Sequence, residues 1–324
     1  MKVIAMMPAR NEAWVIGSSL ACLSGFCDVI LVSDRRSDDA TREICGRFPK
    51  VTLLDPGPES RIREQRWQLL DAARDYDGHN LLWSNDADEL LSPALMKQFL
   101  NGRQDQLTPG TVIEPRFYTL WNSPAQYRDD VSHYQPYWGH MGFVDDRRAD
   151  YDRSLAAPLH EPRIPAGERA PAVRAAELPM LHLQWMIPNR NQLKQAWYRC
   201  REWLDGGKSA ASINELYATT FPAPHARTAT VPSGWIADLT FPSDGSGDRL
   251  PSWHQRELVA WFDRYGIEHF EPLEIWHVGV LRDEFLRRVG RTPKPDRAYL
   301  PSWPVRARRF GRRVMNAARR RLPV

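Results

Sequence analysis

Residues 81–89, LLWSNDADE, join a short apolar run to two aspartates separated by one residue. In an extended segment alternate side chains point the same way, so Asp86 and Asp88 are expected to face one small volume while Ala87 packs inward. Two carboxylates held together repel, and one takes up a proton unless a cation compensates their charge. A hard divalent cation, Mg²⁺ or Mn²⁺, accepts oxygen ligands and leaves positions open for phosphate. The stretch therefore predicts a carboxylate-held metal that binds a nucleotide diphosphate; a solvated turn after a buried strand is the alternative.

The residues before this stretch alternate between predicted strands and helices. Apolar runs predict strands at residues 2–8, 29–33, 51–54 and 80–83, and apolar spacing predicts helices after the first strand and at residues 61–74. Ser37 is expected to cap a helix between the second and third strands, with Asp38 and Asp39 in its first turn. Such alternation predicts an α/β fold with parallel strands, in which a ligand binds beyond the carboxyl ends of the strands where the strand order reverses.

Polar clusters fall at the carboxyl ends of three of these strands. They are residues 8–12 (PARNE), 34–41 (DRRSDDAT) and 86–88 (DAD). Because these ends meet at one edge of a parallel sheet, their coincidence favours the metal site over the solvated turn. No glycine-rich phosphate loop lies near the first two strand ends, so dinucleotide-binding and P-loop folds are not expected. A sugar nucleotidyltransferase would also need a glycine-rich loop after the first strand, which the sequence lacks there.

The order and spacing of these clusters resemble the family 2 glycosyltransferases of the GT-A fold. The matching residues are Pro8, Asn11 and Glu12, then Asp34, Ser37, Asp39 and Thr41, then Arg63 and Arg66, then Asp86, Asp88 and Glu89. The resemblance implies a Rossmann-like nucleotide-binding half with a mixed central sheet, an acceptor-binding half and a small C-terminal helical appendage. It implies that Asp88 ligates the metal and that Asp86 meets the ribose or the donor sugar. The expected donor contacts are Pro8, Ala9, Arg10, Glu12, Asp34, Arg63, Arg66, Asp86 and Lys194.

The second half of the chain supplies further candidates. Aromatic, His and Asp residues are frequent from Gly110 to Tyr151, which fits either an acceptor cleft or β-rich core pieces with polar loops. Glycosyl transfer needs a base for the acceptor hydroxyl proton, and relatives carry a His-Glu pair like that at 160–161. Glu161 is therefore the predicted catalytic base, while a salt bridge between Glu161 and Arg163 is the structural alternative. The other carboxylates considered are Asp129, Asp130, Asp145 and Asp146.

Two cationic or metal-binding side chains follow the acceptor region. By the family resemblance, His182 is a third metal ligand or a diphosphate contact, whereas a lone histidine is otherwise a satisfied core residue. Lys194, with Arg199 or Arg201 as substitutes, is expected to pair with phosphate oxygens, the alternative being a solvated helix face.

Composition limits the classes of partner. The 324-residue chain has a net charge of +4, and the eight arginines between Ala298 and Val324, where there is no acid, leave the remainder at −4. This balance argues against nucleic-acid binding by the body of the protein. The basic tail is expected either to touch an anionic membrane surface or to be disordered. Four cysteines without paired spacing, and no secretion signal or membrane span, indicate a cytoplasmic protein, which the tail would bring to the inner membrane face if it binds there.

The sequence thus divides into five expected segments. They are residues 1–100 for nucleotide-sugar binding, 101–205 for acceptor binding, 206–252 as a loop-rich connection, 253–300 as a helical appendage and 301–324 as a basic tail. The predicted function is metal-dependent transfer of a sugar from a nucleotide-diphosphate donor, with UDP expected, to a hydroxyl of a saccharide or lipid-linked acceptor. Inversion at the anomeric carbon and a role in surface-glycan or lipopolysaccharide synthesis are also expected. The alternative is a nucleotide-sugar-binding protein of the same fold without turnover.

Overall fold

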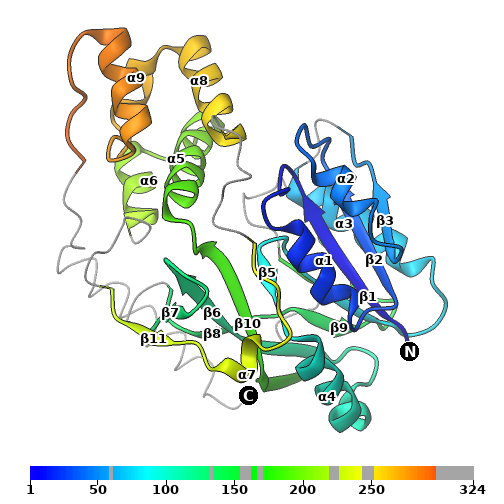
Figure 1. The fold of residues 1–324 in the computed structure, drawn as a ribbon. Helices are drawn as coiled ribbons and strands as arrows, with labels where there is room; N and C mark the ends of the chain where they lie inside the picture. The colour runs from blue at the N-terminus through cyan, green and yellow to red at the C-terminus, as the bar shows by residue number, and fades with distance from the viewer. Residues whose placement is uncertain are drawn as a thin grey trace, which may run out of the picture. The chain divides into compact units, whose positions relative to one another are not determined.

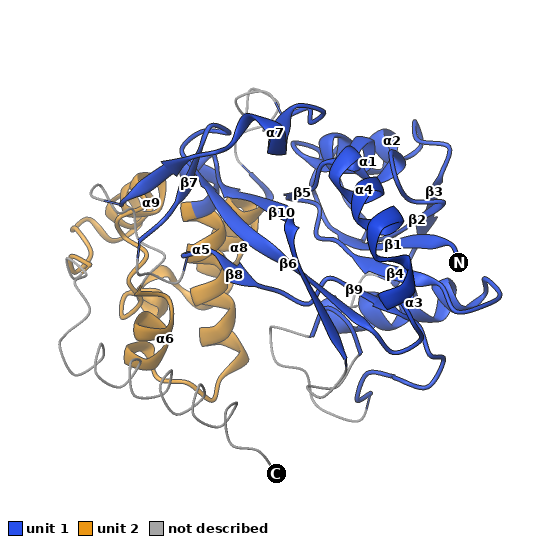
Figure 2. Ribbon diagram, turned by 90° about the horizontal axis from the view of Figure 1, so that it is seen from below, with its two compact units in different colours: residues 1–191, 224–253 blue, residues 192–223, 254–324 orange. Residues whose placement is uncertain are grey.

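The computed structural model describes residues 1–57, 61–130, 134–153, 162–165, 171–218, 226–242 and 252–296. The chain forms two compact units, Met1–Asn191 with Pro224–Trp253 and Gln192–Ala223 with His254–Val324 (Figure 2). The five functional segments stay a prediction. The compact units follow other boundaries because residues 228–230 pair with the first unit's sheet.

The first unit begins with a parallel α/β half (Figure 1). Neighbouring strands lie in the order β3-β2-β1-β4, and β1 is parallel to both β2 and β4. The chain moves outward from β1 to β3 and then returns to β4 on the other side of β1, so the strand order reverses between β1 and β4. The elements are β1 Val3–Ala9, α1 Ile16–Ser24, β2 Val29–Asp34, α2 Thr41–Cys45, β3 Val51–Leu54, α3 Ile62–Arg74 and β4 Leu81–Ser84.

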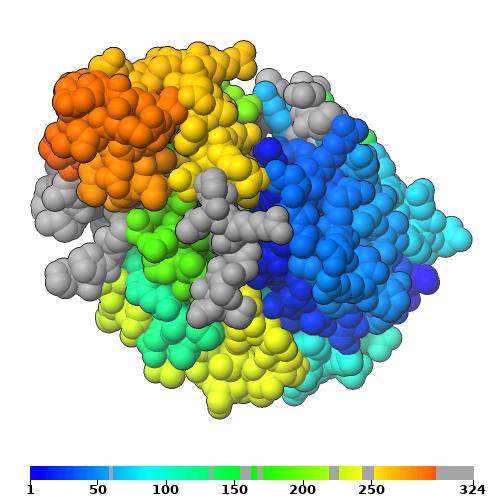
Figure 3. All heavy atoms as spheres, turned by 45° about the horizontal axis from the view of Figure 1, so that its top comes forward, coloured from blue at the N-terminus to red at the C-terminus, as the bar shows by residue number. Residues whose placement is uncertain are grey.

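Strand β1 is buried on both faces, which explains its continuous apolar sequence. Ala5 and Met7 belong to the core shared with α1, whereas Ile4 and Met6 belong to the core shared with α3. This alternation follows from the two-residue period of a strand. Helices α1 and α3 therefore cover opposite faces of the parallel half. In the view of Figure 3 the blue atoms of the N-terminal residues form a continuous surface.

The sheet continues into a mixed half. Strand β9 is antiparallel to β4, β6 is antiparallel to β9, and β10 is parallel to β6, so β6 and β10 run in the same direction as β4. This arrangement confirms the predicted α/β fold with a Rossmann-like half and a mixed central sheet. The remaining elements of the first unit are β5 Glu89–Leu90, α4 Pro93–Arg103, η1 Gln104–Gln106, β6 Val112–Trp121, β7 Gln126–Arg128, β8 Tyr137–Trp138, β9 Gly142–Val144, β10 Ala172–Trp185, β11 Thr228–Thr230 and α7 Ser233–Ile236.

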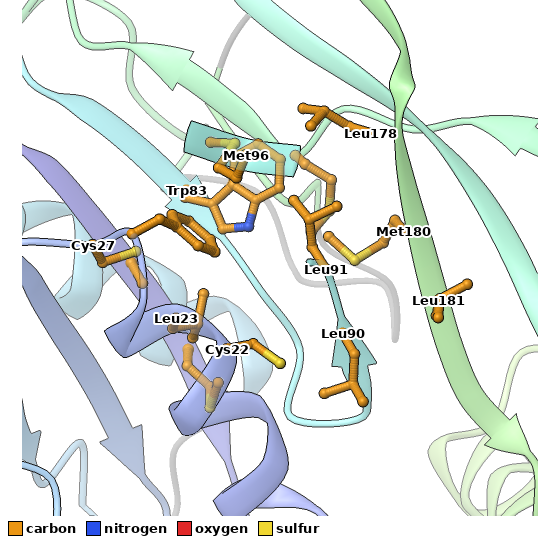
Figure 4. Close-up of a cluster of buried hydrophobic side chains, with 14 of the residues drawn as sticks. Cys22, Leu23, Cys27, Trp83, Leu90, Leu91, Met96, Leu178, Met180 and Leu181 are labelled. Carbon is orange, nitrogen blue, oxygen red and sulfur yellow. The ribbon is translucent and has the colours of Figure 1, made fainter. Parts of the chain in front are cut away.

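A single apolar core joins the two halves of this sheet. In Figure 4, Leu90 and Leu91 lie between Cys22 and Leu23 of α1 and Met180 and Leu181 of β10. Leu90 and Leu181 are fully buried and also form a register pair of the antiparallel β5–β10 ladder. The segment after β4 is thereby anchored from both sides.

The second unit is helical. It contains α5 Pro188–Asp205 from Gln192 onward, α6 Ala210–Leu216, α8 Trp253–Tyr265 from His254 onward, η3 Ile267–Phe270 and α9 Gly279–Val289. Gly266 follows α8 at φ +80°, and Gly290 ends α9 at φ +77°, a left-handed conformation that glycine adopts without strain.

Two expectations about local structure are wrong. Helix α2 begins only at Thr41, and Ser37 lies in the preceding loop because its hydroxyl bonds to Asp34 and to the amide of Asn11. Asp38 also precedes this helix. Residues 206–252 are not only loops: they include α6, β11 and α7, and β11 exists because it pairs with β7, a contact that no local pattern reveals.

Candidate active site

The carboxyl ends of β1, β2 and β4 meet at one edge of the sheet, on both sides of the point where the strand order reverses. Asn11 and Ser37 link the first two ends, because the Asn11 amide donates to Ser37 Oγ at 2.7 Å and the Asp38 amide donates to Asn11 Oδ1 at 2.8 Å. The Glu12 amide donates to Thr41 Oγ1 at 2.8 Å. The motifs at residues 8–12 and 34–41 therefore form one hydrogen-bonded structure.

Two consecutive residues of α3 tie the three strand ends together. Gln65 Nε2 donates to the carbonyl oxygens of Ala9 at 3.3 Å and Ser33 at 2.6 Å. Arg66 Nη1 donates to Ser84 Oγ at 2.7 Å at the end of β4. Both side chains are buried, so this part of the amphipathic helix places two polar groups inside the protein, at the ends of the strands.

Asp86 lies between two guanidinium groups. Its Oδ1 is 3.2 Å from Arg66 Nη2, and its Oδ2 is 3.0 Å from Arg163 Nη2. Burial favours the neutral acid, but Arg163 and then Arg66 outweigh it and hold the pKa of Asp86 below its ordinary value. Asp86 is therefore an ionised carboxylate with both oxygens engaged.

The expected extended geometry of this stretch is wrong. Strand β4 ends at Ser84 and β5 begins at Glu89, and the residues between them form a turn closed by the Glu89 amide and the Asp86 carbonyl oxygen at 3.1 Å. The strand alternation that would point Asp86 and Asp88 the same way does not apply in this turn. The two carboxylates have different neighbours because Arg66 and Arg163 bind Asp86.

Asp88 lies beside His182. Strand β10 pairs with β5 so that His182 stands opposite Glu89, and His182 Nε2 is 3.5 Å from Asp88 Oδ2. The Leu183 amide donates to the Asp88 carbonyl oxygen at 2.8 Å, which fixes the backbone of the turn to β10. The structure thus brings together the two residues predicted as metal ligands.

Glu89 anchors the same turn and binds an arginine that the sequence analysis did not assign to the site. Its Oε1 is 2.5 Å from Arg163 Nη2 and its Oε2 is 2.8 Å from Arg163 Nη1, while Oε2 also accepts the Asp86 amide at 2.9 Å. The salt bridge considered between Glu161 and Arg163 stays a prediction, because Glu161 lies outside the described residues. Burial opposes the charge of Arg163, but Asp86 and Glu89 raise its pKa further above the ordinary range.

Several of the predicted donor-binding residues are buried or contact neighbouring side chains of the protein. Pro8 and Ala9 are buried in β1, and Asp34 is fully buried where it accepts from Ser37. Arg63 Nε is 2.9 Å from Glu64 Oε1, and its guanidinium lies 4.9 Å from the Trp67 ring centroid. Arg10 has its guanidinium 4.6 Å from the Trp253 ring centroid.

Arg190, which no sequence motif singled out, lies at the strand-end edge. Its Nη2 is 3.4 Å from Glu12 Oε2, and its guanidinium lies 4.5 Å from the Trp14 ring centroid. Lys194 belongs to the second unit and stays a prediction, whereas Arg190 in the first turn of α5 belongs to the first. The available signal was the position of Arg190 at the start of a helix directly after a strand of the site.

Two of the carboxylates considered as alternative catalytic bases, Asp145 and Asp146, lie away from the candidate site. Asp145 follows β9, which is antiparallel to β4, so it lies at the opposite edge of the sheet, where its amide donates to the Asn80 carbonyl oxygen at 2.9 Å. Arg74 binds both oxygens of this carboxylate at 3.0 and 2.8 Å. Asp145 and its neighbour Asp146 are thus removed from the candidates, while Glu161 lies outside the described residues and stays a prediction.

The residues present fit a hard divalent cation that takes some of its ligands from the protein and the others from water and a substrate. Among the described residues there is no group of three or more His, Cys, Asp or Glu side chains placed to hold a metal ion. Asp88 Oδ2 and His182 Nε2, at 3.5 Å, are close enough to ligate one cation through bonds of about 2.1 Å. Mg²⁺ ordinarily takes one or two carboxylates, waters and substrate phosphates, so two protein ligands suffice.

Comparisons with known proteins give the following similarities. No protein-family model and no curated protein matches the sequence. TarS 1-349 from S. aureus is 14% identical with a TM-score of 0.40, over 89% of this chain and 85% of that one. The structure of TarS 1-349 in complex with UDP-GlcNAc has the same identity and TM-score, and the match covers 67% of this chain and 71% of that one. A further TarS structure is covered over only 42% of its length.

Glucosyl-3-phosphoglycerate synthase from Mycobacterium tuberculosis is also similar. In complex with Mn²⁺, UDP and glucosyl-3-phosphoglycerate it is 20% identical with a TM-score of 0.26, over 37% of this chain and 44% of that one. Within this chain, the motifs that resemble family 2 glycosyltransferases follow the strands of a Rossmann-like half that continues into a mixed sheet. No helix in the described residues is long and apolar enough to span a membrane.

Proposed function

We propose that the protein is a metal-dependent glycosyltransferase that moves a sugar from a nucleotide-diphosphate donor, a UDP-sugar, to a hydroxyl of an acceptor. The observation that carries this proposal is the pairing of Asp88 and His182 at the edge of the sheet where the strand order reverses. Asp86, held by two arginines, stands next to this pair along the chain. Ligands of parallel α/β sheets bind at this edge.

The charges around the pair suit a departing diphosphate. Asp88 and His182 would hold Mn²⁺ or Mg²⁺, which when bound neutralises developing negative charge on the diphosphate. Arg66 and Arg163 add fixed positive charge on either side of Asp86. Asp86, ionised and oriented by both, accepts hydrogen bonds from donor hydroxyls.

Proton transfer from the acceptor is assigned to Glu161. Arg163, only two residues later in the chain, binds Asp86 and Glu89, and this attachment supports a base close to the site. In a single displacement the acceptor oxygen bonds to the anomeric carbon as the bond to the diphosphate breaks, and the carboxylate takes the hydroxyl proton, so the configuration inverts. The donor contacts proposed from the sequence include Pro8, Arg10, Glu12, Asp34 and Lys194.

The acceptor and the cellular setting are proposed from the sequence. A saccharide or lipid-linked acceptor, in surface-glycan or lipopolysaccharide synthesis at the cytoplasmic face, would suit the eight arginines after Ala298. Basic residues near an anionic bilayer contribute about 1 kcal/mol each. These arginines would hold the protein reversibly at the membrane surface.

The substitution Asp88→Asn tests the proposal. We expect donor turnover, measured as UDP release from candidate UDP-sugars with Mn²⁺, to fall at least about 100-fold because the carboxylate charge at the cation is lost. The melting temperature should stay near the wild-type value. Asp105→Asn, an exposed change in the same unit, is the matched control and should leave turnover unchanged.

Two outcomes would contradict the proposal. Full activity of the Asp88→Asn variant would remove the metal role of this residue. A wild-type protein that binds UDP-sugars and Mn²⁺ but releases no UDP with any donor would instead be the non-catalytic binding protein. The melting curves separate both outcomes from misfolding.

A further inference from the structure

Tyr137 is an exposed aromatic residue near the carboxylate cluster formed by Asp86, Asp88 and Glu89, and no sequence motif assigned it a role. It belongs to the two-residue strand β8 and pairs with Phe117 of β6. The two rings stack with their centroids 5.0 Å apart and an interplanar angle of 11°. Tyr137 is nevertheless 42% exposed. Phe117 covers one face of the tyrosine ring, so the exposed area belongs to the other face and to the edge.

The strand register places this aromatic pair on the same face of the sheet as the predicted metal ligand His182. Phe117 stands opposite Met180 of β10, and His182 follows Met180 by two residues in the same ladder. Residues opposite one another in a ladder, and residues two apart in one strand, point to the same face. Glu89 is in turn the register partner of His182. Tyr137 therefore shares a face of the sheet with His182 and Glu89.

The charged groups of the site act on the Tyr137 hydroxyl. Arg163, which binds the cluster, has its guanidinium 5.5 Å from the Phe117 ring centroid. Burial of the hydroxyl raises the pKa of Tyr137 to about 12, with Arg163 opposing this effect and the carboxylates of the cluster adding to it. Tyr137 is therefore a neutral aromatic side chain at the border of the carboxylate cluster.

Gly139 leaves room for the aromatic stack. A Cβ atom on Gly139 would lie 2.6 Å from Phe117 Cε2 and 3.4 Å from Tyr137 Cε2. The backbone after β8 thus approaches the rings as closely as only glycine allows. Because Phe117 is buried in the core, the ring of Tyr137 packs on a fixed surface.

The place of Tyr137 in the sheet separates it from the nucleotide-binding end. In the strand order, β1 and β2 lie on one side of β4, whereas β9 and β6 lie on the other side, and β8 pairs with β6. The turn with the carboxylate cluster, which follows β4, thus lies between Tyr137 and the ends of β1 and β2. An exposed ring next to the proposed reaction centre, but away from the nucleotide, is suitably placed for the acceptor.

We propose that Tyr137 is a substrate-binding residue whose exposed ring stacks on a pyranose ring of the acceptor, so that the acceptor is a saccharide at the reacting end. The inference rests on the proposed function, because it concerns the acceptor of that reaction. The C–H face of a pyranose packs on an aromatic ring while its hydroxyl groups bind the polar groups around it. A linear polyol offers the same hydroxyl groups without this face.

The experiment measures binding of methyl β-glucopyranoside, methyl β-galactopyranoside and the methyl β-glycoside of N-acetylglucosamine to the full chain saturated with UDP and Mn²⁺. Saturation-transfer NMR detects the binding, and sorbitol is the probe without a ring. Tyr137→Leu removes the flat ring and should weaken pyranoside binding roughly tenfold, whereas Tyr137→Phe keeps the ring and should bind nearly as tightly as the wild type. Tyr265→Leu is the matched control, because Tyr265 of the second unit is 44% exposed.

A second measurement does not depend on the leucine variant. In a deuterated protein with protonated tyrosines, the pyranoside protons should show nuclear Overhauser effects to a tyrosine ring. These signals should disappear in Tyr137→Phe, which keeps the stack on Phe117 and so keeps the fold.

The outcomes separate this inference from the proposed function. Weaker pyranoside binding by a folded leucine variant, with the Tyr265 variant unchanged, supports the stacking role, as do Overhauser signals that Tyr137→Phe removes. Next to a wild type that binds UDP with Mn²⁺, this inference alone is overturned by unchanged binding in Tyr137→Leu, by the absence of these signals, or by equal binding of sorbitol. A wild type that binds no UDP with Mn²⁺ overturns the proposed function, and the inference falls with it.

Discussion

A substitution of Gly142 on β9 would test how packing supports the end of β4, where the turn of the candidate active site begins. A Cβ atom on Gly142 would lie 2.8 Å from Trp83 Cε3, 3.2 Å from Trp83 Cζ3 and 3.4 Å from Leu81 Cδ1. Trp83 is fully buried, and its indole nitrogen donates to Asn85 Oδ1 at 3.3 Å, next to Asp86. The substitution Gly142→Ala therefore forces the indole ring to move inside a packed core.

The magnitude follows from overpacking. Inserting a methyl group into a filled core typically costs about 1–3 kcal/mol, and replacing glycine in a strand returns roughly 0.5–1 kcal/mol through lower chain entropy. We expect the free energy of unfolding to fall by about 1–2 kcal/mol. For a unit of this size the melting temperature should drop by about 2–8 °C.

Calorimetry of the full chain checks this prediction, with Gly102→Ala as the matched control. Gly102 lies within α4 and a Cβ there meets nothing within 4 Å, so the same substitution should raise stability by about 1 kcal/mol through helix propensity. Adding Trp83→Phe to Gly142→Ala should recover part of the loss, which a double-mutant cycle measures. A Gly142→Ala variant as stable as the wild type would refute the reasoning about the indole contact.

Two further predictions concern other parts of the chain. Arg287, and then Arg288, lower the pKa of Glu284 to about 2, so its stabilisation is present above the unfolded pKa of about 4.3 and is lost as the pH falls towards 2. Glu284→Gln should lower the melting temperature at pH 7 but not at pH 2, and an equal deficit at both values would contradict the ion pair. Gln65→Ala should lower stability by about 1–2 kcal/mol in urea unfolding, because the Ser33 carbonyl oxygen loses the Gln65 donor, while the Ala9 carbonyl oxygen keeps the Arg35 amide at 3.0 Å. An unchanged unfolding midpoint would show that the Ser33 carbonyl group finds another partner.

The strand and helix alternation was predictable because it depends on local periodicity. Strand β3 has the predicted bounds and β2 is one residue longer than predicted, while β1 and β4 are each shifted by one residue towards the C-terminus. Buried parallel strands are apolar throughout, and the first three are each followed by a helix, so neighbouring residues alone carry the signal. The polar clusters at residues 8–12 and 86–88 were predictable for the same reason, since they interrupt apolar runs.

The short elements and their caps were less predictable. Strand β5 has two residues and exists because it pairs with β10, which is distant in the sequence. Ser37 has the residue type of a helix cap, but a tertiary hydrogen bond to Asn11 holds it elsewhere. Local propensity is decided over a few residues, and a tertiary contact of similar strength can override it.

The sequence by itself determined the parallel half, the edge of the sheet that carries the candidate site and the identity of the acids placed there. Only the tertiary structure decided which partner each acid receives: His182 for Asp88, and Arg66 with Arg163 for Asp86. The reason is physical. Residues near one another in the chain encode the hydrophobic period of a helix or strand. The pairing of β5 with β10 and the burial of Ile164, next to Arg163, depend instead on how apolar faces that are distant in the sequence pack together.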